Sequence, residues 1–188
     1  MQTAVPDCLD GHAVFRVLLQ AFARPGSIHS LPRGARGPDE ALLRLLASVL
    51  DPEVAFAVVG GSGDIAGRLR LATGGRPAEP EAADFVLFPD GDSGGAVLRL
   101  RRGRSDFPDQ GATAVYAVKQ LSFTGGTAEL TGPGIRDRLQ PSIIGLGEGE
   151  LGWLKEVNAE YPLGVDCIFV DPRGQVMCIP RSTRIGGV

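Results

Sequence analysis

The sequence predicts an α/β protein in which a mixed β-sheet is flanked by helices in three layers. Three observations lead to this fold class. Apolar residues in the N-terminal part recur at the three- and four-residue spacing of amphipathic helices. Residues 54–59 form an uninterrupted apolar run, which is typical of a strand buried on both faces of a sheet. Beyond residue 95 the apolar period shortens toward two, which indicates strands. The chain has 188 residues, of which 43% are hydrophobic, so we predict one domain over residues 1–188.

Two amphipathic helices are predicted before the first strand. Asp10 is a suitable N-cap for a helix that runs to about Ala23, where Pro25-Gly26 stops it. The side chains expected to face the core from this helix are Val14, Phe15, Leu18 and Phe22. After a loop over residues 27–38, Asp39 starts a second helix. Its expected core residues are Ala41, Leu42, Leu45, Leu46 and Val49.

The middle of the chain predicts one βαβ-like unit, then a series of strands and a helix. The unit consists of strand 54–59, helix 64–72 and strand 84–88. The elements expected after it are strands 96–100 and 112–118, a hairpin over 121–130 that turns at Gly125-Gly126, and a helix over 148–159.

The C-terminal part predicts a final hairpin of strands 165–170 and 176–179. Asp171-Pro172-Arg173-Gly174 suits a type I turn that ends on a left-handed glycine, which gives a three-residue loop. In that register Cys178 lies opposite Ile168 and not opposite Cys167. We therefore expect the two thiols to point to opposite faces of the sheet and to pack in the core without forming a disulfide.

Composition and charge argue against several function classes. The formal net charge of -3 removes the global basic field on which nucleic-acid binding depends. The apolar runs are too short to cross a membrane, and the first residues form neither a charged nor an apolar leader. Three cysteines without C-x-x-C spacing indicate reduced thiols. We expect a cytoplasmic protein with no membrane and no nucleic-acid partner.

The pattern Gly61-x-Gly63-x-x-Ala66 follows an apolar strand and opens a helix, which is the context of a dinucleotide fingerprint. The acidic residue that would bind a ribose is not well placed, because Asp84 lies at the wrong end of its strand and Asp90 lies too far along the chain. We interpret the pattern as a glycine-rich connection, with a nucleotide-binding module as the alternative.

The residues do not supply a self-sufficient catalytic centre. His12 and His29 are the only histidines, and both precede the sheet-forming part, which disfavours a histidine-dependent triad or a multi-histidine metal site. Lys119 and Lys155 are the only lysines available for a Schiff base with pyridoxal phosphate. A surface position is expected for Lys155, and Lys119 ends a strand, where a catalytic role is the less favoured alternative. We predict no catalytic residue, no metal and no cofactor, and therefore a subunit in preference to a stand-alone enzyme.

Four arginines cluster around the predicted strand at 96–100 and its exit loop, namely Arg99, Arg101, Arg102 and Arg104. Charges on an edge strand protect it from aggregation, which is the interpretation we favour. The alternative is a surface for a polyphosphate or an acidic partner.

Short landmarks follow one another in a specific order along nearly the whole chain. They are Phe15-Arg16, Arg24-Pro25-Gly26, Ala83-Asp84-Phe85, Arg102-Gly103, Pro108 with Gly111-Ala112-Thr113, Leu130-Thr131-Gly132-Pro133-Gly134-Ile135, Pro162-Leu163-Gly164-Val165-Asp166 and Pro180-Arg181-Ser182-Thr183. In this order and spacing the chain resembles the PhnH family, the H subunit of the bacterial carbon-phosphorus lyase system for phosphonate breakdown. Two features depart from the family pattern: Ser182 stands where threonine is usual, and residues 60–81 carry no landmark.

The resemblance implies a fold similar to that of the pyridoxal phosphate-dependent transferases, but without the cofactor. It implies a homodimer when isolated and association with the G, I and J subunits of the complex. It also implies a place in the complex that exchanges the adenine of ATP for an alkylphosphonate, giving a ribose 1-phosphonate 5-triphosphate. A stand-alone enzyme for a phosphorylated ligand is the alternative function.

Six residues at these landmarks are candidate anion or interface contacts: Arg24, Arg102, Arg181, Gly103, Gly132 and Gly134. The arginines lie beside turns, from which a guanidinium can project toward phosphate or carboxylate. The glycines would let backbone amides approach an anion, and simple turns are the alternative. The surface that meets a partner stays open at this stage.

Overall fold

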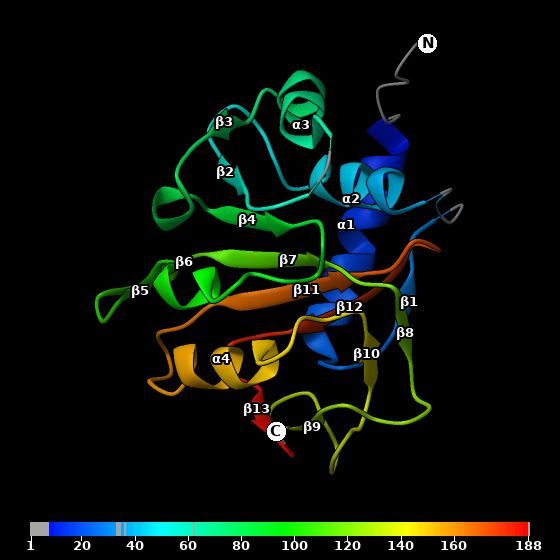
Figure 1. Ribbon diagram of the computed structural model, residues 1–188, viewed down its shortest axis with the longest axis vertical. Helices are drawn as coiled ribbons and strands as arrows, with labels where there is room; N and C mark the ends of the chain where they lie inside the picture. The colour runs from blue at the N-terminus through cyan, green and yellow to red at the C-terminus, as the bar shows by residue number, and fades with distance from the viewer. Residues whose placement is uncertain (1–7, 33–34, 36, 62, 188) are drawn as a thin grey trace.

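A seven-stranded mixed sheet forms the centre of the molecule (Figure 1). The computed structural model describes residues 8–32, 35, 37–61 and 63–187. The strands lie in the order β1-β12-β11-β7-β4-β2-β3. Their bounds are β1 His29–Ser30, β2 Ala55–Val58, β3 Arg76–Pro77, β4 Phe85–Phe88, β7 Thr113–Ala117, β11 Asp166–Val170 and β12 Gln175–Ile179. The strands from β11 to β3 run parallel, whereas β12 is antiparallel to both of its neighbours. The predicted α/β class and mixed sheet are confirmed.

Helices cover both faces of this sheet (Figure 1). On one face lie α1 (Cys8–Ala23), α2 (Pro38–Leu46) and α3 (Ile65–Thr73), and on the other lie α4 (Glu150–Val157) and the short 3-10 helix η2 (Ala96–Arg99). Successive residues of a central strand face the two sides in turn, so that Tyr116 of β7 packs on the α4 side and Val115 on the α1 side. Burial on both faces explains why these strands are apolar throughout. No helix in the described part of the chain has the length and apolarity needed to cross a membrane.

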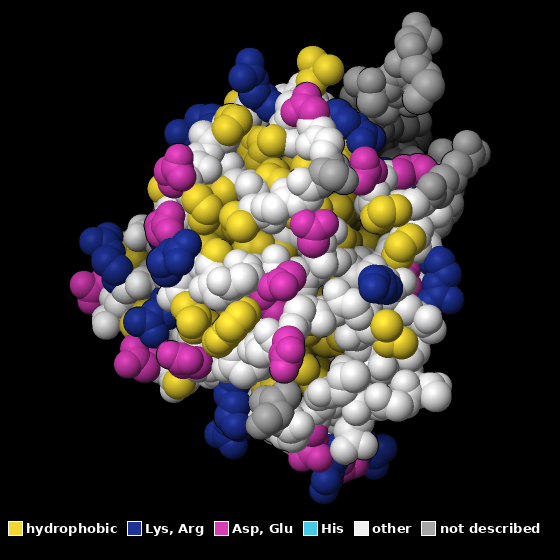
Figure 2. Space-filling view, in the orientation of Figure 1, with side chains coloured by type: hydrophobic (Ala, Val, Ile, Leu, Met, Phe, Trp, Pro, Cys, Tyr) yellow, Lys and Arg dark blue, Asp and Glu magenta, His cyan; other side chains and the backbone are white. Residues whose placement is uncertain are grey.

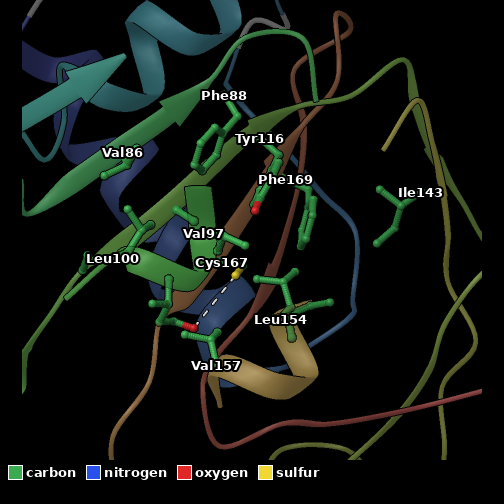
Figure 3. Close-up of a cluster of buried hydrophobic side chains, with 14 of the residues drawn as sticks. Val86, Phe88, Val97, Leu100, Tyr116, Ile143, Leu154, Val157, Cys167 and Phe169 are labelled. Carbon is green, nitrogen blue, oxygen red and sulfur yellow. Dashed lines mark hydrogen bonds between the residues drawn. The ribbon is translucent and has the colours of Figure 1, made fainter. Parts of the chain in front are cut away.

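Aromatic side chains of three adjacent strands stack in the core on the α4 side (Figure 3). The ring of Tyr116 in β7 lies between those of Phe88 in β4 and Phe169 in β11, at centroid distances of 4.8 Å and 5.4 Å. Each such pair contributes about 0.5–1.5 kcal/mol beyond the area it buries. Leu154 and Val157 of α4 complete this core, which seats the helix over the middle of the sheet.

The N-terminal helix differs from its prediction at the start and on one face. It begins at Cys8, so Asp10 lies inside the helix and is not its N-cap. Phe15 is 44% exposed instead of facing the core. The buried face of the helix is formed by Val14, Leu18 and Ala21, which are spaced four and three residues apart. Phe15 therefore lies outside this buried face.

The other two predicted helices on this face are close to their expected positions. In α2 the buried residues are Ala41, Leu42, Leu45 and Leu46, as predicted, whereas Val49, the fifth predicted core residue, lies beyond the end of the helix and is partly buried. Helix α3 begins after Asp64, whose carboxylate accepts the backbone N–H of Gly67 at 2.9 Å and caps the helix. With β2 and β4, α3 forms the predicted βαβ unit.

The strand predicted at 96–100 is wrong, because this segment is the 3-10 helix η2. The buried pair that anchors the segment is Val97 and Leu100, three residues apart, while Leu98 is exposed. A short exposed hairpin follows η2, formed by β5 (Arg102–Arg104) and β6 (Phe107–Gly111).

The hairpin predicted over 121–130 is also wrong, because its two halves pair with distant strands. One half, β8 (Gln120–Ser122), pairs with β10 (Ser142–Ile144). The other half, β9 (Glu129–Thr131), pairs with β13 (Arg184–Gly186) near the C-terminus. The Gly125-Gly126 turn therefore connects two different small sheets.

The predicted C-terminal hairpin is confirmed in detail. Strands β11 and β12 pair with Ile168 opposite Cys178, and Gly174 takes a positive φ of 78° at the end of the turn. Cys167 lies in the core on the α4 side, and Cys178 lies in the core on the α1 side. Both thiols are buried and free.

Candidate functional site

A groove next to α4 brings together three segments that are far apart in the sequence. It is bounded by the end of α4 and the turn after it, by the loop that follows β9, and by the segment that leads into β13. Its volume of about 820 Å³ lies within the range of small-molecule sites. The lining residues on which the chemistry depends are Gly132, Lys155, Arg181, Ser182, Thr183 and Arg184.

Backbone pairing and close packing hold the walls of the groove in place. Strand β13 pairs with β9, which joins the C-terminal segment to the loop at Gly132. A Cβ on Gly132 would lie 3.1 Å from the carbonyl oxygen of Ser182, so glycine lets these two segments approach each other. The third wall is tied down by Asn158, whose side chain accepts the N–H of Val165 at 2.7 Å and donates to the Val165 carbonyl at 3.1 Å.

The three cations of the groove differ in whether an acidic side chain neutralises their charge. The guanidinium of Arg181 donates to both carboxylate oxygens of Asp166, at 2.5 Å for the shortest contact, and to the Pro108 carbonyl at 2.6 Å. The charge of Arg181 is therefore balanced, and the side chain ties the β5–β6 hairpin to β11. Lys155 and Arg184 are exposed and form no ion pair among the residues that the structure describes.

Two residues with hydroxyl side chains, Ser182 and Thr183, lie between Arg181 and Arg184 in the sequence. Ser182 makes no side-chain hydrogen bond with any described residue. Thr183 is only 4% exposed, and its Oγ1 has no hydrogen-bond partner among the described residues. Leaving a buried hydroxyl unpaired costs about 1–3 kcal/mol, and native proteins contain few such groups. Thr183 is therefore an unusual residue in the wall of the groove.

The structure separates the six sequence-predicted contacts into three places. Arg181 and Gly132 line the groove. Arg102 and Gly103 lie in β5, where Arg102 approaches Glu160 at 3.7 Å. Arg24 and Gly134 lie at the end of α1, where a Cβ on Gly134 would be 2.6 Å from the Ala23 carbonyl oxygen. Their roles as anion or interface contacts stay predictions.

The predicted strand at 96–100, around which Arg99, Arg101, Arg102 and Arg104 were expected to cluster, is the helix η2. The arginines make separate contacts. Arg99 pairs with Glu81 at 3.0 Å, Arg101 pairs with Asp84, and the guanidinium of Arg104 lies 5.5 Å from the ring centre of Phe107. On the face shown in Figure 2, basic side chains are likewise scattered and interspersed with acidic ones.

The glycine-rich loop after β2 is closed by a carboxylate of the same chain. The backbone N–H of Gly61, which a dinucleotide phosphate would be expected to accept, donates to Oδ2 of Asp90 at 2.6 Å. Pro89 packs directly against Gly61, since a Cβ there would lie 2.9 Å from the proline ring. These contacts support the interpretation as a connection between β2 and α3.

A second cluster of ionisable groups is fully buried under the N-terminus of α4. Glu150 accepts the backbone N–H of Ser93 at 2.5 Å and the hydroxyl of Tyr116 at 2.7 Å. Burial raises the pKa of Glu150, although the hydrogen bonds from Ser93 and Tyr116 act in the opposite direction. Burial also raises the pKa of Tyr116. Each carboxylate oxygen has a protein donor, so this cluster ties α4 to the sheet.

The sequence interpretation missed three groove residues. Lys155 was treated as an ordinary surface lysine, Thr183 only as a landmark, and Arg184 was not considered. The local signal was the run Arg181-Ser182-Thr183-Arg184, in which every side chain is a hydrogen-bond donor. Among the described residues, no three His, Cys, Asp or Glu side chains are arranged to hold a metal ion.

Comparison with known proteins agrees with the landmarks along the chain. Residues 6–186 match the family model described as bacterial phosphonate metabolism protein (PhnH). A protein of Stutzerimonas stutzeri named as C-P lyase subunit HtxG is 38% identical over 173 residues, which cover 91% of this chain and 83% of that protein. The alpha-D-ribose 1-methylphosphonate 5-triphosphate synthase subunit PhnH of Rhizobium meliloti is 26% identical over 183 residues, which cover 94% and 90% of the two chains. The chain belongs to the PhnH family of bacterial phosphonate metabolism proteins.

Proposed function

We propose that the chain is a subunit of the carbon-phosphorus lyase complex in phosphonate catabolism. In this role it supports the conversion of ATP and an alkylphosphonate to a ribose 1-phosphonate 5-triphosphate, with release of adenine. The observation that carries the proposal is the family match over residues 6–186, together with two relatives, one named as a C-P lyase subunit and the other as a subunit of alpha-D-ribose 1-methylphosphonate 5-triphosphate synthase.

The chemistry of the groove fits a contributory role better than that of an independent catalyst. Apart from the amide of Asn158, its polar side chains are cations and hydroxyls, which hold an anion but are poor proton acceptors near neutral pH. Both histidines lie elsewhere: His12 is exposed on α1, and His29 is in β1. Burial and the nearby charge of Arg24 lower the pKa of His29.

We propose the G, I and J subunits as partners in the cytoplasm, and a homodimer for the isolated chain. A subunit is expected to expose apolar side chains that a partner covers. Phe15 and Leu19, one turn apart on α1, are 44% and 54% exposed. Their side chains share one face of the helix and offer such a surface.

The alternative is a stand-alone enzyme for a phosphorylated ligand, which the cationic groove favours. One assay separates the two functions: adenine release from ATP in the presence of methylphosphonate. With G, I and J present, we expect turnover that is lost when this chain is left out. Turnover by the isolated chain would contradict the subunit proposal.

Docking through α1 can be tested in the same preparation. We expect Phe15→Ser combined with Leu19→Ser to weaken co-purification with the partner subunits, because polar side chains remove the apolar contact. Leu71→Ser is the matched control, since Leu71 is 83% exposed on α3. Equal co-purification of both variants would exclude this face of α1 as the docking surface.

A further inference from the structure

Helix α1 carries a second apolar face besides the one that packs against the sheet. Phe15, Leu19 and Ala23 follow one another at four-residue spacing, and all three are exposed. The two large side chains, Phe15 and Leu19, are 44% and 54% exposed. Because residues four apart lie one above another on a helix, these three side chains form one outward line about 12 Å long, the α1 stripe. Single exposed apolar residues are common, but an aligned stripe is typical of a surface that a partner covers.

A row of polar side chains runs beside the α1 stripe, and none of its members is acidic. His12, Arg16, Gln20 and Arg24 are exposed and also recur every four residues. Residues 11–24 contain no aspartate or glutamate. Arg16 and Arg24 form no ion pair with any described residue. The outward side of α1 is therefore apolar along one line and positively charged along the next, in a chain whose net charge is -3.

This combination of an apolar stripe and a basic row selects one kind of partner. An amphipathic helix fits the stripe, because its own apolar residues repeat at the same spacing and the side-chain rows of two helices interdigitate. The charges of Arg16 and Arg24 are complementary to acidic side chains beside the apolar face of that helix. A second copy of this chain fits less well. Antiparallel pairing of two α1 helices about a twofold axis would place both basic rows on the same side, where like charges repel.

We infer that the α1 stripe and its basic row dock an amphipathic helix of a partner subunit, and that acidic side chains flank the apolar face of this helix. The inference rests on the proposed function, because the partner is one of the other subunits of the complex, and it adds the structure and the charge that the partner segment must have. Helix α1 and helix α4 lie on opposite faces of the sheet (Figure 1). A helix bound to α1 therefore leaves the groove beside α4 open.

The first test measures binding of the purified chain to the immobilised G, I and J subunits, each alone, over a series of salt concentrations. We expect the parent chain to bind one of them with an affinity that falls as salt is added. Arg16→Glu is expected to weaken this binding at least about tenfold, because attraction to an acidic side chain becomes repulsion. Arg70→Glu is the matched control, since Arg70 is exposed on α3 and the change in net charge is the same. Its expected effect is below about twofold.

The outcomes of this test separate the inference from the proposed function. If the parent chain binds none of the three subunits, the proposed function is contradicted and the inference falls with it. If the parent chain binds and Arg16→Glu binds equally well, the inference alone is overturned. Equal losses in Arg16→Glu and Arg70→Glu would show an effect of net charge without a docking site at α1, and would also overturn it.

The second test asks whether a second copy of the chain uses the same face. Sedimentation equilibrium of the isolated chain gives its oligomeric state, for the parent and for Phe15→Ser combined with Leu19→Ser. We expect the two to be the same. A shift of the variant to a smaller species would assign the α1 stripe to a contact between copies and overturn the inference.

The third test identifies the partner segment. A photo-crosslinking benzoylphenylalanine in place of Leu19 reacts with whatever covers the α1 stripe, and mass spectrometry of the bound complex locates the crosslinked peptide. We expect a peptide from one partner subunit in which apolar residues recur at three- and four-residue spacing beside aspartate or glutamate. A crosslinked peptide without this period, or without acidic residues, would contradict the inference.

Discussion

Glu150 is a carboxyl group placed where water cannot reach it. It lies at the first position of α4, directly beneath the aromatic stack of the sheet, and accepts hydrogen bonds from Ser93 and Tyr116. A buried carboxylate without partners would be strongly destabilising, and these two donors offset part of that cost. Glu150 links α4 to the loop at Ser93 and to β7 at Tyr116. The burial that allows these contacts also disfavours its ionised form.

The raised pKa of Glu150 makes folding stability depend on pH. Above the ordinary glutamic acid value of about 4.3, the unfolded chain has released a proton that the folded chain still holds. The contribution of Glu150 is thus fully present below that value and is lost as the pH rises through the native pKa. The amide oxygen of Glu150→Gln can still accept the Ser93 N–H, its NH2 group can donate to the Tyr116 hydroxyl oxygen, and the side chain has no charged form. We therefore expect its melting temperature, relative to the parent chain, to increase from about pH 4 to about pH 8.

Glu148→Gln is the matched control, because Glu148 is exposed just before α4. Thermal melts monitored by circular dichroism across the pH range give the comparison. A constant difference between Glu150→Gln and the parent chain at all pH values would mean that Glu150 does not titrate differently in the folded state.

At the scale of elements, several landmark segments meet through glycines that leave no room for a side chain. Gly134, with a φ of 82°, packs against the end of α1 at Ala23 and Pro25. Gly26 packs in turn against Leu130 and Leu139. The turn after α1 and the loop after β9 therefore interlock, which helps to place one wall of the groove.

Gly134→Ala is expected to lower the free energy of unfolding by about 1–3 kcal/mol. The cause is twofold, because the residue needs a left-handed backbone and a Cβ would lie 2.6 Å from a carbonyl oxygen. Urea denaturation measures the change. Gly152→Ala is the control in α4, where no atom lies within 4 Å of the added Cβ, and it is expected to raise stability by up to about 1 kcal/mol. Unchanged stability of Gly134→Ala would contradict the interlock.

At the scale of the whole molecule, two cores share one sheet. Residues of β4, β7, β11 and β12 contribute alternately to both cores, so neither core can open without exposing the central strands. Cys167 lies in the core on the α4 side and Cys178 in the core on the α1 side, so the reactivity of each thiol measures the opening of one core. Burial raises the pKa of both thiols well above the ordinary value, which further suppresses their reactivity in the folded state.

We expect both thiols to react with a maleimide at the same slow rate, the rate of global unfolding. A Cys8→Ser background leaves these two as the only cysteines, and mass spectrometry of peptides follows each one. Denatured protein, in which both react at once, is the control. Much faster labelling of one cysteine would show that its side of the sheet opens independently.

Much of the fold could be predicted from local patterns. The N-terminal helices carry an amphipathic period that reflects the face they bury, whereas the central strands, including the C-terminal hairpin, carry apolar runs that reflect burial on both faces. The opposition of Cys178 and Ile168 was also predicted, because a short turn sets the register of a hairpin. The errors arose where local pattern and distant packing disagree: residues 96–100 were predicted as a strand, but the segment is a 3-10 helix anchored by Val97 and Leu100, three residues apart.

The sequence by itself determined the α/β class, the order of most elements and the family of the chain, because these depend on local periodicity and ordered landmarks. Only the tertiary structure decided that β9 pairs with β13, and that Lys155, Thr183 and Arg184 share one groove with Gly132. The physical reason is that the partner of a strand depends on packing between segments far apart in the chain. A local pattern records which face a residue buries, but not which distant segment covers that face.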